Sequence, residues 1–252
     1  MILVTIIVSF LITYFLVPLI NKYGRKYNFL DFPNSRKQHK VPIVRIGGLA
    51  ILIGFLITLL SIYKIDYYQD YGILRNANTK FYVLILCSSL FFLIGFLDDL
   101  KRKSPYLRLI LQFAIATLSF SIGISFNISF LIPKLSYLFP ESFLIIINYL
   151  ITTFYIVGLT NAVNWWDGLD GLAAGTVLIC LIFLLILNLN IYGVMNTPDC
   201  ISTSALIGSC FGFLKYNYKP AKIIMGDGGA YFLGFSLASQ TLLTQSYQIS
   251  NI

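Results

Sequence analysis

The sequence predicts an all-α fold, a polytopic membrane bundle of about eight transmembrane helices. Its composition is 58% hydrophobic and only 11% charged, whereas soluble domains carry about 25% charged residues. Eight apolar runs approach the roughly 20 residues that a helix needs to cross the hydrocarbon core. The loops between these runs also differ in charge. We therefore expect the chain to lie in a lipid bilayer as a single domain, 1–252.

The charge difference sets the predicted orientation. If the N-terminus lies outside, 14 of the 18 lysines and arginines fall in cytoplasmic loops, in agreement with the positive-inside rule. These are Lys22, Arg25, Lys26, Arg36, Lys37, Lys40, Arg45, Lys101, Arg102, Lys103, Arg108, Lys215, Lys219 and Lys222. The net charge of +8 thus reflects topology and contact with anionic lipid, and it requires no nucleic acid.

The first run, 1–20, is predicted to be a retained helix, because its basic residues follow it, whereas a signal peptide has them in front. The second run, 46–63, comes after the loop "DFPNSRKQHKVPIVRIGG", whose charge is mostly a topology signal. This loop contains the only histidine, His39, which we do not assign to a metal.

The third run, 81–97, leads into "GFLDDLKRKS". Asp98 and Asp99 therefore stand at a helix C-terminus, where the helix dipole disfavours carboxylates. The alternative to a functional role is a purely structural one, in which the three basic residues at 101–103 neutralise the two carboxylates. After the fourth run, 109–126, two prolines and a lysine interrupt residues 127–142, which we expect to be external or interfacial.

The fifth run, 143–160, ends in "NAVNWWDGLDGLAAG", before the sixth run, 172–190. Asn161, Asn164, Asp167 and Asp170 recur every three residues and would form one polar stripe on a helix. Capping of the sixth helix explains one of the aspartates but not all four side chains. We interpret the motif as a polar site.

The seventh run, 201–214, precedes "KYNYKPAKIIMGDGGAYFLG", and the eighth, 228–243, is the least apolar. Asp227 is predicted to lie near a helix N-terminus, with an N-cap as the structural alternative. The nearby glycines leave backbone N–H groups open to an anion. Asn217, Lys219 and Lys222 supply polar and cationic neighbours.

Six aspartates fall on the predicted cytoplasmic side, next to helix ends: Asp31, Asp98, Asp99, Asp167, Asp170 and Asp227. Ionisable groups at membrane depth are costly enough to suggest function, and these six mostly avoid that depth, which favours a site at the inner surface. We therefore expect a polar site formed by the cytoplasmic loops. The four cysteines are scattered and indicate neither a disulfide framework nor a thiolate metal site.

Four motifs, "RKQHKVPIVRIGG", "FLDDL", "NAVNWWDGLDGLAAG" and "MGDGGAYFLG", closely resemble those of polyprenyl-phosphate N-acetylhexosamine-1-phosphate transferases, also called glycosyltransferase family 4. The branch that handles UDP-N-acetylglucosamine matches better than the phospho-N-acetylmuramoyl-pentapeptide branch. The resemblance implies transfer of a sugar-1-phosphate from a UDP-sugar to a membrane polyprenyl phosphate, with Mg²⁺ and release of UMP. It also implies a multi-pass protein of the cell membrane that acts at its cytoplasmic face in cell-wall or surface-polysaccharide synthesis.

The resemblance also implies roles for particular residues. Asp98 and Asp99 match an acidic pair near the lipid phosphate, and Asp167 and Asp170 belong with them to the catalytic set. Asp227 matches a metal-binding aspartate, with Asp167 as a second ligand. The residues implied in substrate binding are Asn161, Asn164, Asn217, Lys101, Arg36, Lys37, His39 and Arg45.

Members of the family have further helices and a histidine-rich loop after the eighth helix, so we expect this chain to be C-terminally truncated. On that basis we expect little or no transfer by the polypeptide alone. The alternatives are a pentapeptide-branch transferase, an inactive remnant and a transporter, which ranks lowest because transporters bind substrate near the bilayer midplane. The sequence leaves open whether two copies of the chain form a homodimer.

Overall fold

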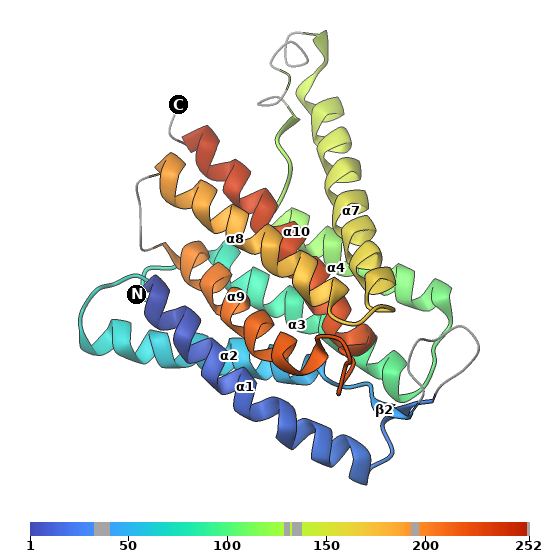
Figure 1. Cartoon of the computed structure of the whole chain (residues 1–252). Coiled ribbons are helices and arrows are strands. Elements are labelled where there is room, and N and C mark those ends of the chain that lie inside the picture. The colour runs from blue at the N-terminus through green and yellow to red at the C-terminus, as the bar shows by residue number, and fades with distance from the viewer. Residues whose placement is uncertain (33–40, 129–131, 133–137, 193–196, 251–252) are drawn as a thin grey trace.

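The computed structural model describes residues 1–32, 41–128, 132, 138–192 and 197–250. These residues form eight helices and one short hairpin (Figure 1). The helices are α1 (Ile2–Lys26), α2 (Gly48–Tyr68), α3 (Thr79–Leu100), α4 (Pro105–Ser121), α7 (Glu141–Trp166), α8 (Leu172–Tyr192), α9 (Pro198–Asn217) and α10 (Gly226–Ser250). The hairpin pairs β1 (Leu30–Asp31) with β2 (Ile43–Val44) in antiparallel register.

Each of the eight predicted apolar runs corresponds to one helix, so the all-α membrane fold is confirmed. Within the described parts of the chain, five helices are long and apolar enough to cross a membrane by length and composition: α1, α2, α3, α7 and α8. Among the described helices, α4 is shorter, at 17 residues, and α9 and α10 carry more polar side chains. Half of the predicted segment 127–142 lies outside the described residues, and its last two residues belong to α7.

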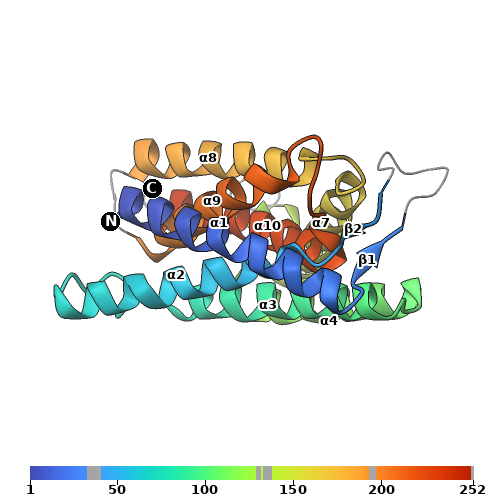
Figure 2. The same cartoon turned by 60° about the horizontal axis from the view of Figure 1, so that its bottom comes forward.

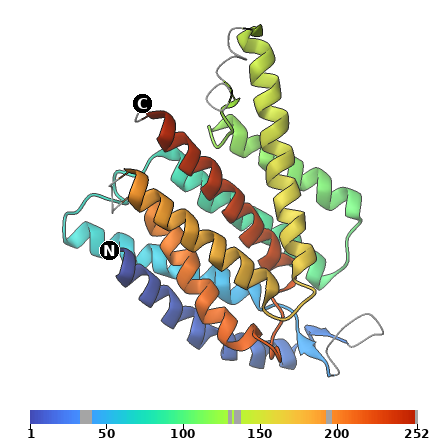
Figure 3. The same ribbon diagram turned by 45° about the horizontal axis from the view of Figure 1, so that its top comes forward.

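The two more polar helices lie inside the bundle. Every residue of α10 from Gly226 to Gln240 is buried, and α10 runs between α8 and α7 in Figure 3. α9 packs against α1, α2 and α8. Its hydroxyls donate to carbonyls of their own helix, as when Thr203 Oγ1 donates to the Asp199 carbonyl at 2.8 Å. Protein neighbours thus replace lipid around these helices, which explains why low hydropathy is tolerated.

The loops after α1, α3, α7 and α9 all lie at one end of the bundle, which we call the site end (Figures 1 and 2). Backbone hydrogen bonds fasten the segment before α10 to the hairpin and to α2. The Ile224 N–H donates to the Val44 carbonyl at 2.8 Å, and the Gly48 N–H donates to the Met225 carbonyl at 2.8 Å. These bonds fix the start of α10 beside the residue that follows β2, Arg45.

Two glycines allow close approach at the site end. A Cβ added at Gly95 would stand 2.3 Å from the Asp227 carbonyl oxygen, so only glycine lets α3 lie this close to α10. Gly226 has a φ of +79°, a left-handed conformation that other residues rarely adopt. Both positions bring the start of α10 against the end of α3.

Candidate active site

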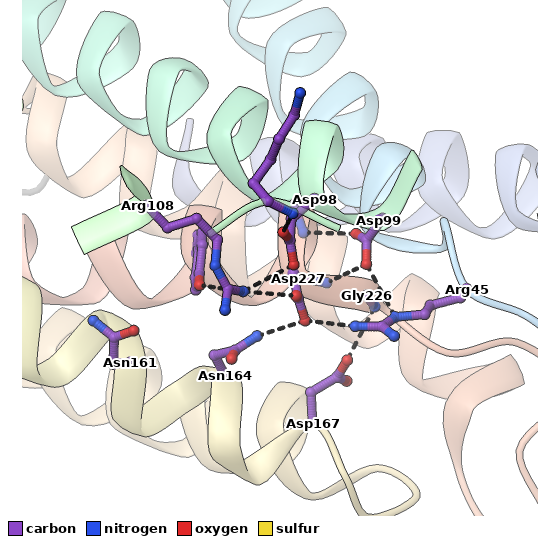
Figure 4. Close-up of polar contacts among 12 residues, drawn as sticks. Arg45, Asp98, Asp99, Arg108, Asn161, Asn164, Asp167, Gly226 and Asp227 are labelled. Carbon is purple, nitrogen blue, oxygen red and sulfur yellow. Dashed lines mark hydrogen bonds and ion pairs between the residues drawn. The ribbon is translucent and has the colours of Figure 1, made fainter. Parts of the chain in front are cut away.

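Charged side chains from five segments meet at the site end (Figure 4). They come from the end of α3, the first turn of α4, the end of α7, the start of α10 and the residue after β2. The structure therefore brings together residues that the sequence separates by up to 182 positions. The participating side chains are Asp98, Asp99, Arg108, Asn164, Asp167, Asp227 and Arg45.

Asp227 stands at the centre of this cluster, in the first turn of α10. Its Oδ1 accepts from Arg45 Nη2 at 2.8 Å and from Asn164 Nδ2 at 2.9 Å. Its Oδ2 lies 3.4 Å from Arg108 Nη1. Asp227 is thus a bridging carboxylate between two arginines, and it does not cap its own helix.

Asp99 is the carboxylate that caps α10. Its two oxygens accept from the Asp227 N–H at 3.1 Å and from the Gly228 N–H at 2.9 Å. Arg45 Nε approaches the same carboxylate at 3.0 Å. These contacts give Asp99 a positioning role, because they attach α3 to the start of α10 and orient Arg45.

Asp98 is held by its own loop. It accepts from the Lys103 backbone N–H at 2.6 Å and from Arg108 Nη1 at 2.8 Å. The backbone bond and the guanidinium compensate the unfavourable position at a helix C-terminus. The side chain of Lys101, in contrast, is exposed at the loop surface.

The predicted polar stripe is continuous only in part. α7 ends at Trp166, so Asp170 lies beyond the helix and accepts from the Ala221 N–H at 3.0 Å. Asn164 reaches Asp227, while Asn161 donates to Gln112 Oε1 at 2.7 Å and stands apart from the cluster (Figure 4). Expecting all four side chains on one helical face was wrong, because α7 ends at Trp166, before Asp167 and Asp170.

Asp167 and Asn217 connect loops at the site end. Asp167 accepts from the Gly226 N–H at 2.9 Å, so it fixes the entrance to α10 and does not cap α8. Asn217 accepts from the Gly171 N–H at 3.2 Å and donates to the Ile223 carbonyl at 2.9 Å. Asn217 therefore joins the loop before α8 to the loop before α10.

Two pockets open on either side of Arg45 and Asp31. The first, which we call the Asn164 pocket, has a volume of about 230 Å³ and is lined by Asp31, Arg45, Asn164, Trp165, Asp167, Gly168, Leu169, Asp170, Asn217, Ile224 and Asp227. The second, the hairpin pocket, has a volume of about 490 Å³ and is lined by Asn28, Phe29, Leu30, Asp31, Phe32, Arg45, Ile46, Asp99, Leu100 and Arg102. The walls of the Asn164 pocket contain four aspartates and one arginine, so a phosphate ligand there would need a cation beside it.

The electrostatics of the site reflect charges held away from water. Burial raises the pKa of Asp167 well above its ordinary value, the hydrogen bond from Gly226 opposes this rise, and the charge of Asp227 adds to it. Burial acts to lower the pKa of Arg45, but the carboxylates of Asp227 and Asp99 outweigh burial and raise it. Arg45 therefore stays charged. The cluster contains four carboxyl groups and two guanidinium groups, so a cation bound beside them would favour the ionised form of the carboxyls.

Some functional residues were missed from the sequence, and others cannot be placed. From the sequence, Arg108 was counted only among the loop charges that set the membrane topology. A cation in the first turn of an apolar helix interacts unfavourably with the helix dipole, so its position was itself an indication of function. Two neighbours of these side chains carried no signal in the sequence: Tyr231, whose hydroxyl lies 3.4 Å from Arg108 Nη1, and Gln112, which accepts from Asn161. Arg36, Lys37 and His39 lie outside the described residues.

Comparison with known proteins places this geometry in a family. The family model described as glycosyl transferase family 4 matches residues 81–245, a range that runs from the first turn of α3 into α10. The chain belongs to glycosyl transferase family 4. The family predicted from the four motifs is thereby confirmed, and the matched region contains every carboxylate of the cluster.

Similar proteins have names in two branches of the family. The chain is 34% identical to a probable undecaprenyl-phosphate N-acetylglucosaminyl 1-phosphate transferase of Bacillus subtilis, over 96% of this chain and 63% of that protein. It is 33% identical to a phospho-N-acetylmuramoyl-pentapeptide-transferase of Clostridioides difficile, over 97% of this chain and 76% of that protein. The chain is also 26% identical to a decaprenyl-phosphate N-acetylglucosaminephosphotransferase of Mycobacterium leprae, over 91% of this chain and 58% of that protein.

Proposed function

We propose that this site belongs to an enzyme that transfers N-acetylglucosamine-1-phosphate from a UDP-sugar to a polyprenyl phosphate and releases UMP. The observation that carries the proposal is the cluster of carboxylates and arginines beside the Asn164 pocket, at one end of a membrane bundle. A UDP-sugar approaches from water, whereas a polyprenyl phosphate keeps its tail in the bilayer. Their phosphates therefore meet at a membrane surface, which we assign to the cytoplasmic face from the loop charges.

Mg²⁺ is the cofactor that we propose for the site. Among the described residues, no three His, Cys, Asp or Glu side chains form a ready metal cluster. Mg²⁺ needs only one or two protein carboxylates, since waters and substrate phosphates complete its coordination. Asp227 and Asp167, which both line the Asn164 pocket, have the required oxygen chemistry. The bound ion would neutralise charge on the diphosphate.

Arginines and carboxylates of the chain would position the reacting groups. Arg45 borders both pockets and offers a planar guanidinium to phosphate oxygens. The acceptor phosphate, with a second pKa of about 6, is largely dianionic at neutral pH and hardly needs a base. We therefore assign Asp98, which is already paired with Arg108, to orienting the acceptor in a direct in-line displacement.

Equilibrium binding tests the substrate assignment. The purified chain, in nanodiscs with Mg²⁺, is expected to bind labelled UDP-N-acetylglucosamine, and UMP should displace it. Asp227→Asn should weaken this binding by at least about tenfold, since it removes a carboxylate ligand of the proposed Mg²⁺. The matched control is Asp70→Asn, a change at an exposed carboxylate outside the cluster. Absence of binding by the unsubstituted chain would contradict the proposal.

Stereochemistry tests the direct displacement. Product formed from a UDP-sugar with a chiral, isotopically labelled β-phosphorus should show inversion at that atom. A covalent aspartyl intermediate requires two displacements and would give retention, which would refute the orienting role of Asp98.

A further inference from the structure

A buried polar cluster lies in the half of the bundle away from the site end, where α8, α9 and α10 meet. Gln240 of α10 donates from Nε2 to Ser202 Oγ of α9 at 2.6 Å. Both side chains are almost fully buried, at 1% and 0% exposed. Polar side chains inside a membrane bundle are costly and often functional, so this pair indicates more than packing.

Four buried oxygens of α8 and α10 have no hydrogen-bond partner within the described part of the chain. They are Asn188 Oδ1, Ser236 Oγ, Ser239 Oγ and Gln240 Oε1. The Ser202 hydroxyl already donates to the Asp199 carbonyl at 3.0 Å, so it accepts from Gln240, and the amide oxygen of Gln240 points away from it. Unpaired buried oxygens are unfavourable, and they point to a ligand that the protein itself does not supply.

Helix geometry brings three of these oxygens to the level of Ser202. Ser236 and Gln240 are one turn apart on α10 and share a face. Asn188 stands four residues before the end of α8, and Ser202 stands four residues after the start of the antiparallel α9. Asn188 is buried, and α8 packs on both α9 and α10. We call Asn188, Ser202, Ser236 and Gln240 the Gln240 site.

A carboxylate stands next to the Gln240 site. Asp199 is only 4% exposed and precedes Ser202 by three residues, so the two share one side of α9. The helix dipole favours an acid in this first turn, and Asp199 alone would therefore not indicate a site. Beside the unpaired oxygens, however, its charge attracts a cation strongly, because the interior has a low dielectric constant.

We propose that the Gln240 site binds a monovalent metal cation, Na⁺. Amide and hydroxyl oxygens are suitable ligands for hard cations. An amide oxygen can only accept, so the site is satisfied by a cation or by water. The single neighbouring carboxylate, Asp199, matches a single positive charge. The site lies toward the other end of α10 from Asp227 and is separate from the proposed Mg²⁺ site.

Thermal unfolding in detergent without Mg²⁺ tests the inference. Replacement of choline chloride by NaCl at constant ionic strength should raise the melting temperature, by roughly 3–6 °C for each tenfold rise in Na⁺ above its Kd. Gln240→Met and the milder Ser236→Ala should abolish this shift. Ser204→Ala is the matched control, because Ser204 is also buried but its hydroxyl donates to the Cys200 carbonyl at 2.6 Å.

The outcomes separate this inference from the proposed function. Asp227→Asn alters the proposed Mg²⁺ site and should leave the Na⁺ shift unchanged. If the unsubstituted chain melts at one temperature in both salts, water fills the Gln240 site and the inference is overturned. A shift that persists in both Gln240→Met and Ser236→Ala, or that disappears in Asp227→Asn, would place the Na⁺ elsewhere and would also overturn it.

Discussion

At the scale of single residues, we expect Arg108 to have the largest effect on stability among the site residues that the sequence did not predict. Its Nη1 approaches Asp98 at 2.8 Å and both Asp227 Oδ2 and Tyr231 Oη at 3.4 Å. Its side chain is 23% exposed and that of Asp98 only 7%. Removal of Arg108 would leave the Asp98 carboxylate without its charged partner, with only the Lys103 backbone N–H to compensate it.

Arg108→Met is therefore expected to destabilise the protein by about 3 kcal/mol, the range seen when a buried ion pair loses one partner. Thermal unfolding in detergent measures this change. The control is Arg75→Met, because the Arg75–Asp70 pair is exposed and such pairs contribute about 1 kcal/mol or less. Equal shifts in both variants would mean that Arg108 does not stabilise the cluster.

The buried carboxyl group of Asp167 lowers the stability of the folded protein at neutral pH. Because its folded-state pKa is raised, the folded protein holds the proton more tightly than the unfolded chain. Stability therefore falls as pH rises from the ordinary carboxyl pKa of about 4 through the raised value, and the penalty is complete above it.

Asp167→Asn removes this penalty and keeps an oxygen for the Gly226 N–H. We expect a higher melting temperature than that of the unsubstituted chain at neutral pH. The difference should shrink on acidification toward the ordinary carboxyl pKa of about 4, where the aspartate of the unfolded chain also becomes protonated. A variant that melts lower at neutral pH would show that the negative charge is stabilising.

At the scale of elements, the contact between α3 and α10 fixes the distance from the acid pair to Asp227. Gly95→Ala should push these helices apart, since its Cβ would overlap the Asp227 carbonyl, and overpacking of this kind costs about 1–3 kcal/mol. UDP-sugar binding should weaken as well. Gly158→Ala in α7 is the matched control, because a Cβ added there would meet no atom within 4 Å. Similar stability of the two variants would contradict the close approach.

At the scale of the whole molecule, the orientation in the membrane is testable by cysteine labelling. Lys26→Cys lies at the site end and Asp70→Cys at the opposite end, and both positions are exposed. Cys180 would first be replaced by Ser, because Cys87, Cys200 and Cys210 are buried. An impermeant maleimide should label Asp70→Cys in intact cells and Lys26→Cys only after lysis. The reverse pattern would place the site outside.

The sequence by itself determined the eight helices, the position of the polar motifs at one end of the bundle, and the family. These features follow from local properties, since a run of apolar residues crosses a bilayer and loop charge sets its direction. Asp98, Asn164 and Asp227 were identified as site candidates because carboxylates and amides next to apolar runs are conspicuous.

Only the tertiary structure decided how those side chains are paired. Asp99 caps a helix 128 residues away, and Arg45 and Arg108 converge on Asp227 from separate loops. Asp170 and Asn217 instead tie loops together. Such partners depend on the packing of α3 and α7 around α10, and no local pattern encodes a distance between helices that are far apart along the chain.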